Sequence, residues 1–152
     1  MKKVLLAIAA LAFMAWGCGS DSSDEEITPA YLQAGSDVRP TTWVAPDYSL
    51  YELTMSVQVQ LGDSLAAYQS RADLMCATVN GEVRAVASPM STLDIVYYPL
   101  TIAGNGNEQM ITLRYYCDRL HRIYTIENWA SFDASIAPIG NSGIYRPKFS
   151  TK

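Results

Sequence analysis

Histidine and cysteine are scarce in this sequence. Its 152 residues include one histidine, His121, and three cysteines. They form no cluster of the kind that binds zinc, so we expect neither a metal site nor a cofactor. A Ser-His-Asp hydrolase would pair His121 with Asp118 and a serine, but no serine stands in a nucleophile-elbow motif. We therefore expect no catalytic residue and no enzyme, with His121 an ordinary polar residue beside the Asp118-Arg119 turn.

Clusters of basic residues are also absent. The chain carries 11 Lys and Arg against 15 Asp and Glu, a formal net charge of −4. Phosphate binding needs grouped Lys and Arg, so we exclude nucleic acid as a partner. The region from residue 40 onward is close to neutral and long enough for one domain with a modest core.

Only one long apolar run occurs, and it lies at the start of the chain. Lys2 and Lys3 precede an uncharged apolar stretch over residues 4–16, and the small Gly17 follows. A basic start, a short apolar segment and a small residue are typical of a signal peptide, here residues 1–17. The run is shorter than the roughly 20 residues that span a bilayer, so no transmembrane helix is expected.

Cys18 changes what this signal means. Residues 15–18, Ala-Trp-Gly-Cys, resemble a bacterial lipobox, in which the cysteine is acylated and becomes the new N-terminus. The resemblance implies a lipoprotein held in the bilayer by acyl chains, palmitate among them, on Cys18. The alternative is an ordinary secretory signal with a chance cysteine.

A polar, acidic segment follows the lipidation site. Residues 19–26 read Gly-Ser-Asp-Ser-Ser-Asp-Glu-Glu, a composition that does not pack a core. We expect residues 18–39 to form a disordered tether and residues 40–152 to form the folded domain. The acidic run also resembles the signal that sends Bacteroidetes lipoproteins to the outer cell surface. We expect an outer-membrane protein displayed at the surface, with the periplasmic face as the alternative.

Period-two alternation of apolar and polar residues dominates the folded part. Leu53, Met55, Val57 and Val59 alternate with polar residues, as in a strand with one buried face. Asn80-Gly81 is typical of a two-residue type I′ hairpin, and Pro99 suggests a sheet edge or a bulge. We expect strands over residues 52–61, 74–79, 82–87, 94–102, 110–117, 120–127 and 144–149. Six or seven short strands without an amphipathic helix predict an all-β chain, a single antiparallel Ig-like or jelly-roll-like β-sandwich.

Several of these segments resemble a β-sandwich domain of secreted and surface proteins of the Bacteroidetes. Residues 40–46 match an opening with Pro and Trp, and residues 51–57 match a first strand with Met. Residues 73–87 match a second strand that begins at an Asp and continues into a hairpin. Residues 97–104 match a Tyr-rich strand that ends in Gly, and residues 111–116 match an Ile-x-Leu-x-x-Tyr strand. Val83 and Ala85 replace a cysteine and a glycine of that family. The resemblance implies a β-sandwich fold and an extracytoplasmic setting, but no reaction.

Cys76 and Cys117 are a candidate disulfide, because both fall in expected strands of an exported chain. Such a bond would stabilise the fold by about 3–5 kcal/mol on the chain-entropy model. Two buried free thiols are the alternative. Glu82 and Arg84 are two residues apart on one strand, so they share a face and are expected to form a surface ion pair.

Aromatic residues are the best candidates for ligand binding. The chain has ten tyrosines and three tryptophans, and exposed rings are the flat platforms on which sugars stack. The candidate ligand-binding rings are those of Trp43, Trp129, Tyr145, Tyr98 and Tyr116. Rings that instead fill the core are the alternative.

We therefore expect a membrane-anchored, cell-surface binding module whose ligand is a glycan or an envelope or host protein. A structural or accessory subunit of an envelope protein complex is the second hypothesis. An exposed apolar patch or an unpaired edge strand would favour it.

Overall fold

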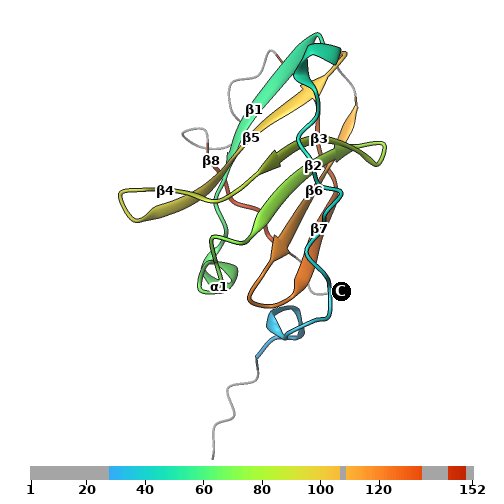
Figure 1. The fold of residues 1–152 in the computed structure, drawn as a ribbon. Coiled ribbons are helices and arrows are strands. Elements are labelled where there is room, and N and C mark those ends of the chain that lie inside the picture. Colours follow the sequence, from blue (N-terminus) through green and yellow to red (C-terminus); the bar gives the residue numbers. More distant parts are fainter. Residues whose placement is uncertain (1–27, 107–108, 135–143, 150–152) are drawn as a thin grey trace, which may run out of the picture.

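Two β-sheets packed face to face make up the fold (Figure 1). The computed structural model describes residues 28–106, 109–134 and 144–149, and within these ranges it contains eight strands. The strands are β1 Leu53–Val59, β2 Leu74–Val79, β3 Glu82–Ala87, β4 Met90–Thr92, β5 Ile95–Gly104, β6 Met110–Cys117, β7 Arg122–Ser131 and β8 Ile144–Tyr145. A single helical turn, α1 Asp63–Ala66, joins β1 to β2. The predicted all-β sandwich is confirmed.

Each sheet contains four strands. The first has the order β4-β5-β1-β8, and the second has the order β3-β2-β6-β7. Neighbouring strands are antiparallel except β1 and β8, which pair in parallel. At Pro99, β5 pairs with β1 only, because the pairing of β5 with β4 extends no further than Tyr97, opposite Met90. A proline without an N–H is tolerated at such a locally free edge, as its sequence position suggested.

Two tight hairpins shape the middle of the chain. Asn80 and Gly81 have φ of 52° and 80°, the left-handed pair of a type I′ turn, so the predicted β2–β3 hairpin is confirmed. Leu93 and Asp94 have φ of 49° and 65° and connect β4 to β5. The sequence did not predict β4, because Leu93 is not a residue that usually occupies such a turn.

The inner faces of the two sheets form the main core. Met55, Val57 and Val59 are buried on β1 and alternate with exposed polar residues, as predicted. Ile111, Leu113 and Tyr115 of β6 face them from the other sheet. At the C-terminal end of β5, a Cβ on Gly104 would lie 2.7 Å from the Phe132 ring, so only glycine fits there.

An N-terminal strap, residues 29–43, covers the outer side of the second sheet. The Gly35 N–H donates to the Leu120 carbonyl (2.7 Å), and the Asp37 N–H donates to the His121 carbonyl (2.8 Å). A Cβ on Gly35 would lie 2.8 Å from that His121 oxygen, so the close approach requires glycine. Figure 1 shows the strap, in blue and teal, passing beside β7.

The strap corrects the predicted extent of the tether. The Asp37 carboxylate accepts the Ile123 N–H at 2.8 Å, and the Tyr124 hydroxyl donates to the Tyr31 carbonyl. The prediction of a disordered tether is therefore wrong for residues 29–39, which belong to the folded domain. Backbone pairing with the β6–β7 turn, which depends on the fold, holds this polar segment in place.

Candidate functional site

The structure buries three of the five predicted ligand-binding rings and leaves the other two half-buried. Trp43 is only 8% exposed and packs on Leu74, Cys76 and Tyr116 at the outer side of the second sheet. The rings of Tyr98 and Tyr116 are fully buried, and those of Trp129 and Tyr145 are half-buried against each other, with centroids 5.1 Å apart. A sugar needs an open ring face, so the prediction is wrong for Trp43, Tyr98 and Tyr116. A ligand-binding role of the half-buried Trp129 and Tyr145 stays a prediction.

The two strand cysteines are free, so the predicted disulfide is wrong. Cys76 lies opposite Arg114 in the β2–β6 pairing and points toward Trp43 of the strap. Cys117, three residues further along β6, lies in the core between the sheets. Because side chains alternate between the two faces of a sheet, the two sulfur atoms lie on opposite faces and do not meet. Burial raises the pKa of the Cys76 thiol to about 12, so it stays protonated at neutral pH.

His121 lies in the β6–β7 turn with a φ of 47°. Ser36 and Asp37 of the strap line a shallow hollow together with it, but the Asp37 carboxylate accepts the Ile123 N–H. Within residues 28–106, 109–134 and 144–149, no hydrogen bond joins the His121 ring to a hydroxyl or a carboxylate. The geometry of a catalytic triad is absent there.

The predicted ion pair between Glu82 and Arg84 is confirmed. The Arg84 Nη2 lies 3.0 Å from Glu82 Oε2, and the guanidinium stacks over the Tyr51 ring at 4.6 Å. The Tyr51 hydroxyl donates to Glu82 at 2.6 Å, and this bond, followed by the charge of Arg84, lowers the pKa of the Glu82 carboxyl. The cluster ties Tyr51, just before β1, to β3 and serves structure.

Asp73 is a buried carboxylate that the sequence did not single out as a candidate. Its carboxylate is fully buried and accepts hydrogen bonds from the Tyr115 hydroxyl (2.8 Å), the Tyr98 hydroxyl (3.2 Å) and the Asp118 N–H (2.9 Å). Ser70 adds its N–H and its hydroxyl at 2.9 and 3.0 Å. Five donors satisfy the carboxylate, so Asp73 joins the α1–β2 loop to β5 and β6 and serves structure.

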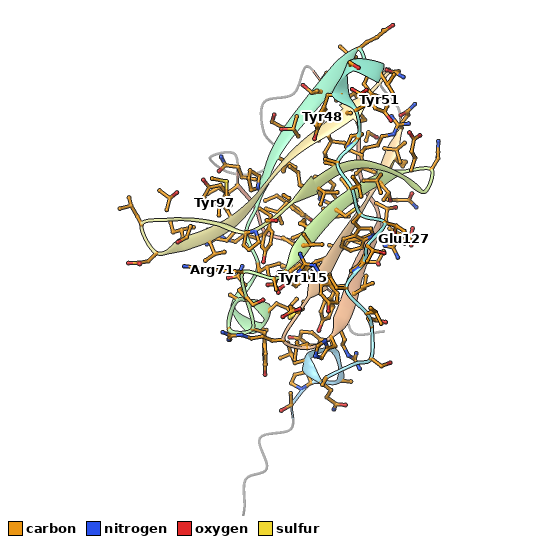
Figure 2. The ribbon with its side chains drawn as sticks, in the orientation of Figure 1. Tyr48, Tyr51, Arg71, Tyr97, Tyr115 and Glu127 are labelled. Atoms are coloured by element: carbon orange, nitrogen blue, oxygen red, sulfur yellow. The ribbon has the colours of Figure 1, made fainter. Side chains whose placement is uncertain are left out.

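An arginine-lined hollow, the arginine cleft, lies on the surface beside hairpin β4–β5. Its volume is about 620 Å³, and its walls include Arg71, Arg119, Met90, Ser91 and Val96. Figure 2 labels Arg71 on the loop next to the hairpin that carries Tyr97. Arg71 and Arg119 are both exposed. They are far apart in the sequence and line the same cleft only because the α1–β2 loop and the β6–β7 turn fold to the same end of the sandwich.

Another hollow, of about 500 Å³, lies between the strap and β7. Tyr31 and Asp37 on its strap side are hydrogen-bonded across to Tyr124 and Ile123. These two strap groups hold the strap to the sheet and are not free for a ligand, whereas both arginines of the arginine cleft are exposed, which makes that cleft the better candidate.

Hairpin β4–β5 carries a group of exposed apolar side chains. Met90, Leu93 and Ile95 are 52%, 91% and 44% exposed, and all lie within six consecutive residues. In Figure 1 this hairpin extends outward beyond the two sheets. Of these three residues only Ile95 lies in an expected strand, over residues 94–102, whereas the sequence predicted no strand at Met90 and Leu93.

Comparison with known proteins finds no match to a family model, to a curated protein or to a solved structure. The resemblance to a Bacteroidetes domain therefore stays a prediction. In the part of the chain that the structure describes, no helix is long and apolar enough to cross a membrane, and no three His, Cys, Asp or Glu residues gather as a metal site would require. Cys18 and the predicted signal peptide lie outside the described residues.

Proposed function

We propose that this chain is a lipid-anchored envelope protein that binds another protein through hairpin β4–β5. The observation that carries the proposal is the exposed apolar group of Met90, Leu93 and Ile95. Single exposed apolar residues are common on protein surfaces, but three on one projecting hairpin are typical of an interaction site. The proposal keeps the binding module expected from the sequence and assigns it a protein ligand.

The backbone at the tip of the hairpin supports the same proposal. Leu93 has a φ of 49°, a left-handed conformation that costs a branched residue roughly 1–2 kcal/mol. Asparagine or glycine would relieve this strain. A strained leucine that is almost fully exposed gains nothing inside the isolated domain, whereas a partner with an apolar pocket would bury it.

A protein ligand accounts for the hairpin better than a glycan or a bilayer does. Sugar recognition relies on open aromatic faces, and the rings of Trp43, Tyr98 and Tyr116 are covered. Insertion into an anionic bilayer favours Lys and Arg at the apolar tip, but the tip carries Asp94 beside Leu93. The nearby Arg71 and Arg119 line a cleft whose walls include neither Leu93 nor Asp94. An apolar tip flanked by an acid and by hydroxyl groups suits a protein surface.

The lipid anchor rests on Lys2, Lys3, the apolar residues 4–16 and Cys18. The expected intact mass of protein extracted from membranes is that of residues 18–152 plus acyl chains. A soluble product without acyl chains would contradict the anchor. Protease treatment of whole cells separates the two locations, because cleavage is expected for the surface and protection for the periplasmic face.

Cross-linking in intact cells tests the hairpin. A photo-reactive benzoylphenylalanine in place of Leu93 is expected to give a discrete cross-linked protein band. The same residue in place of Val44, which is 66% exposed on the chain after the strap, is the matched control and should give none. Cross-links to lipid alone, or equal bands from both positions, would contradict the proposal.

An accessory subunit of an envelope complex is the second candidate, and the free edge of β4 favours it. β4 ends its sheet, so its outer edge has no strand partner within the described residues. A permanent subunit would co-purify with the cross-linked protein after mild detergent extraction without cross-linking, whereas a transient binding module would not.

A further inference from the structure

The arginine cleft is positively charged on an acidic protein. Arg71 and Arg119 line it, and no Asp or Glu is among its wall residues. The ion pair that the structure forms within the described ranges, Glu82 with Arg84, lies elsewhere. Arg119 makes only a long contact, 3.5 Å from its Nη1 to the Ala67 carbonyl. Both guanidiniums therefore have donors free to bind a carboxylate, which an arginine can hold with two parallel hydrogen bonds.

The same cleft has apolar and edge-strand character. Val96 of β5 and Met90 of β4 line it, and Met90 is also one of the exposed hairpin residues. Met90 and Ser91 belong to the edge strand of the first sheet. An edge strand offers its unpaired N–H and C=O groups to an extended segment, which is a common mode of peptide recognition.

We infer that the arginine cleft binds an extended acidic segment of the partner protein, with its carboxylates on Arg71 and Arg119 and its apolar side chains against Met90 and Val96. The inference rests on the proposed function, since it names the part of the partner that lies next to hairpin β4–β5. The region from residue 40 onward is close to neutral, so it exerts no broad attraction on acidic groups, and the two arginines make the cleft a local positive site. The volume of about 620 Å³ fits a short peptide stretch and not only a single ion.

The test uses fluorescence anisotropy with the purified full chain in mild detergent. The probe is a labelled decapeptide of alternating glutamate and valine, beside glutamine–valine and lysine–valine peptides of the same length. We expect the glutamate peptide to bind and the other two to bind at least tenfold more weakly. Added salt should weaken the binding further, because exposed charge pairs are screened.

Two variants locate the binding in the cleft. Replacing both cleft arginines, Arg71→Ala with Arg119→Ala, is expected to weaken the glutamate peptide about tenfold, through loss of charge-assisted hydrogen bonds. Arg146→Ala is the matched control, because Arg146 is exposed and outside the cleft, and it should leave the affinity unchanged. Circular dichroism of each variant verifies that the sheets are retained.

The outcomes separate this inference from the proposed function. Equal binding of all three peptides, or equal effects of the cleft and control variants, would overturn the inference. Binding of a carboxylated polysaccharide such as polygalacturonate in place of the peptide would overturn it too. If the Leu93 cross-link to a protein persists in those cases, the proposed function stands without an acidic segment. If that cross-link is also absent, both fail.

Discussion

A single carboxylate holds three parts of the fold together. Asp73 is fully buried, has no cation beside it in the described part of the chain, and accepts hydrogen bonds from Ser70, Tyr98, Tyr115 and Asp118. Buried carboxylates are costly unless every oxygen lone pair finds a donor. Two backbone N–H groups and three hydroxyl groups donate to the Asp73 carboxylate and thereby offset the cost of burying it.

Replacing this carboxylate should destabilise the protein without changing its shape. In Asp73→Asn the amide nitrogen would face donors instead of accepting from them, so we expect a loss of about 3 kcal/mol in the free energy of unfolding. Urea denaturation followed by circular dichroism measures this. Asp94→Asn is the control: Asp94 is exposed in a turn at positive φ, and its substitution should be near neutral. Equal effects of the two changes would contradict the role assigned to Asp73.

At the same scale, burial by the strap explains why the Tyr116 ring does not form the predicted ligand site. Alternation along β6 places Tyr115 and Tyr116 on opposite faces, and the sequence suggested that one of the two would be exposed. Both are buried, since Tyr115 faces the core and Tyr116 lies beside Trp43 of the strap. The second face is closed by a segment that precedes the sheet by many residues, which local alternation does not reveal.

At the scale of elements, hairpin β4–β5 combines strain with exposure. A type I′ turn favours Asn-Gly, as at Asn80-Gly81, but this hairpin has Leu93-Asp94 in the left-handed region. The short β4 pairs with β5 over only three residues, Met90 to Thr92. The backbone of this turn is thus less stable with Leu93-Asp94 than it would be with Asn-Gly.

Relieving this strain should raise stability while lowering binding. Leu93→Asn is expected to increase the free energy of unfolding by about 1 kcal/mol, because asparagine tolerates the left-handed conformation. Leu93→Ala keeps the unfavourable backbone and removes the apolar contact, so it should leave stability nearly unchanged. Thermal unfolding measures the first effect, and cross-linking from benzoylphenylalanine in place of Met90, with and without the Leu93 substitutions, measures the second. Loss of stability in Leu93→Asn would mean that the leucine packs within the domain.

At the scale of the whole molecule, the core contains ionisable groups that must stay neutral. Burial raises the pKa of the Tyr98 and Tyr115 hydroxyls above the ordinary value of 10.0, and the neighbouring Asp73 charge raises it further. In the folded state both tyrosines keep their protons at a pH where the unfolded chain loses them. The folded state then binds more protons, so stability must fall as pH rises.

The protein should therefore be sensitive to base. The contribution of these tyrosines is complete below pH 10 and is lost progressively above it, by up to about 1.4 kcal/mol per pH unit for each. Urea midpoints measured from pH 8 to pH 11 follow this loss. Tyr98→Phe should lower stability at pH 8 by roughly 1 kcal/mol through its lost hydrogen bond, and it should also flatten the decline above pH 10. An unchanged slope in Tyr98→Phe would show that other groups cause the decline.

Local patterns in the sequence determined the strands other than β4 and one of the hairpins. The alternation of Met55, Val57 and Val59 requires a half-buried strand, and Asn80-Gly81 requires a tight turn, because both depend on the stereochemistry of neighbouring residues. The ion pair of Glu82 with Arg84 is local in the same sense.

Only the tertiary structure decided which faces are closed and which residues meet. The strap buries the outer side of β2 and β6 through Trp43, and it thereby removes rings and a cysteine from solvent that their own strands would have left open. Arg71 and Arg119 come together because two distant loops share one end of the sandwich. Such contacts depend on how sheets stack and how segments cross them, and no spacing along the chain encodes that directly.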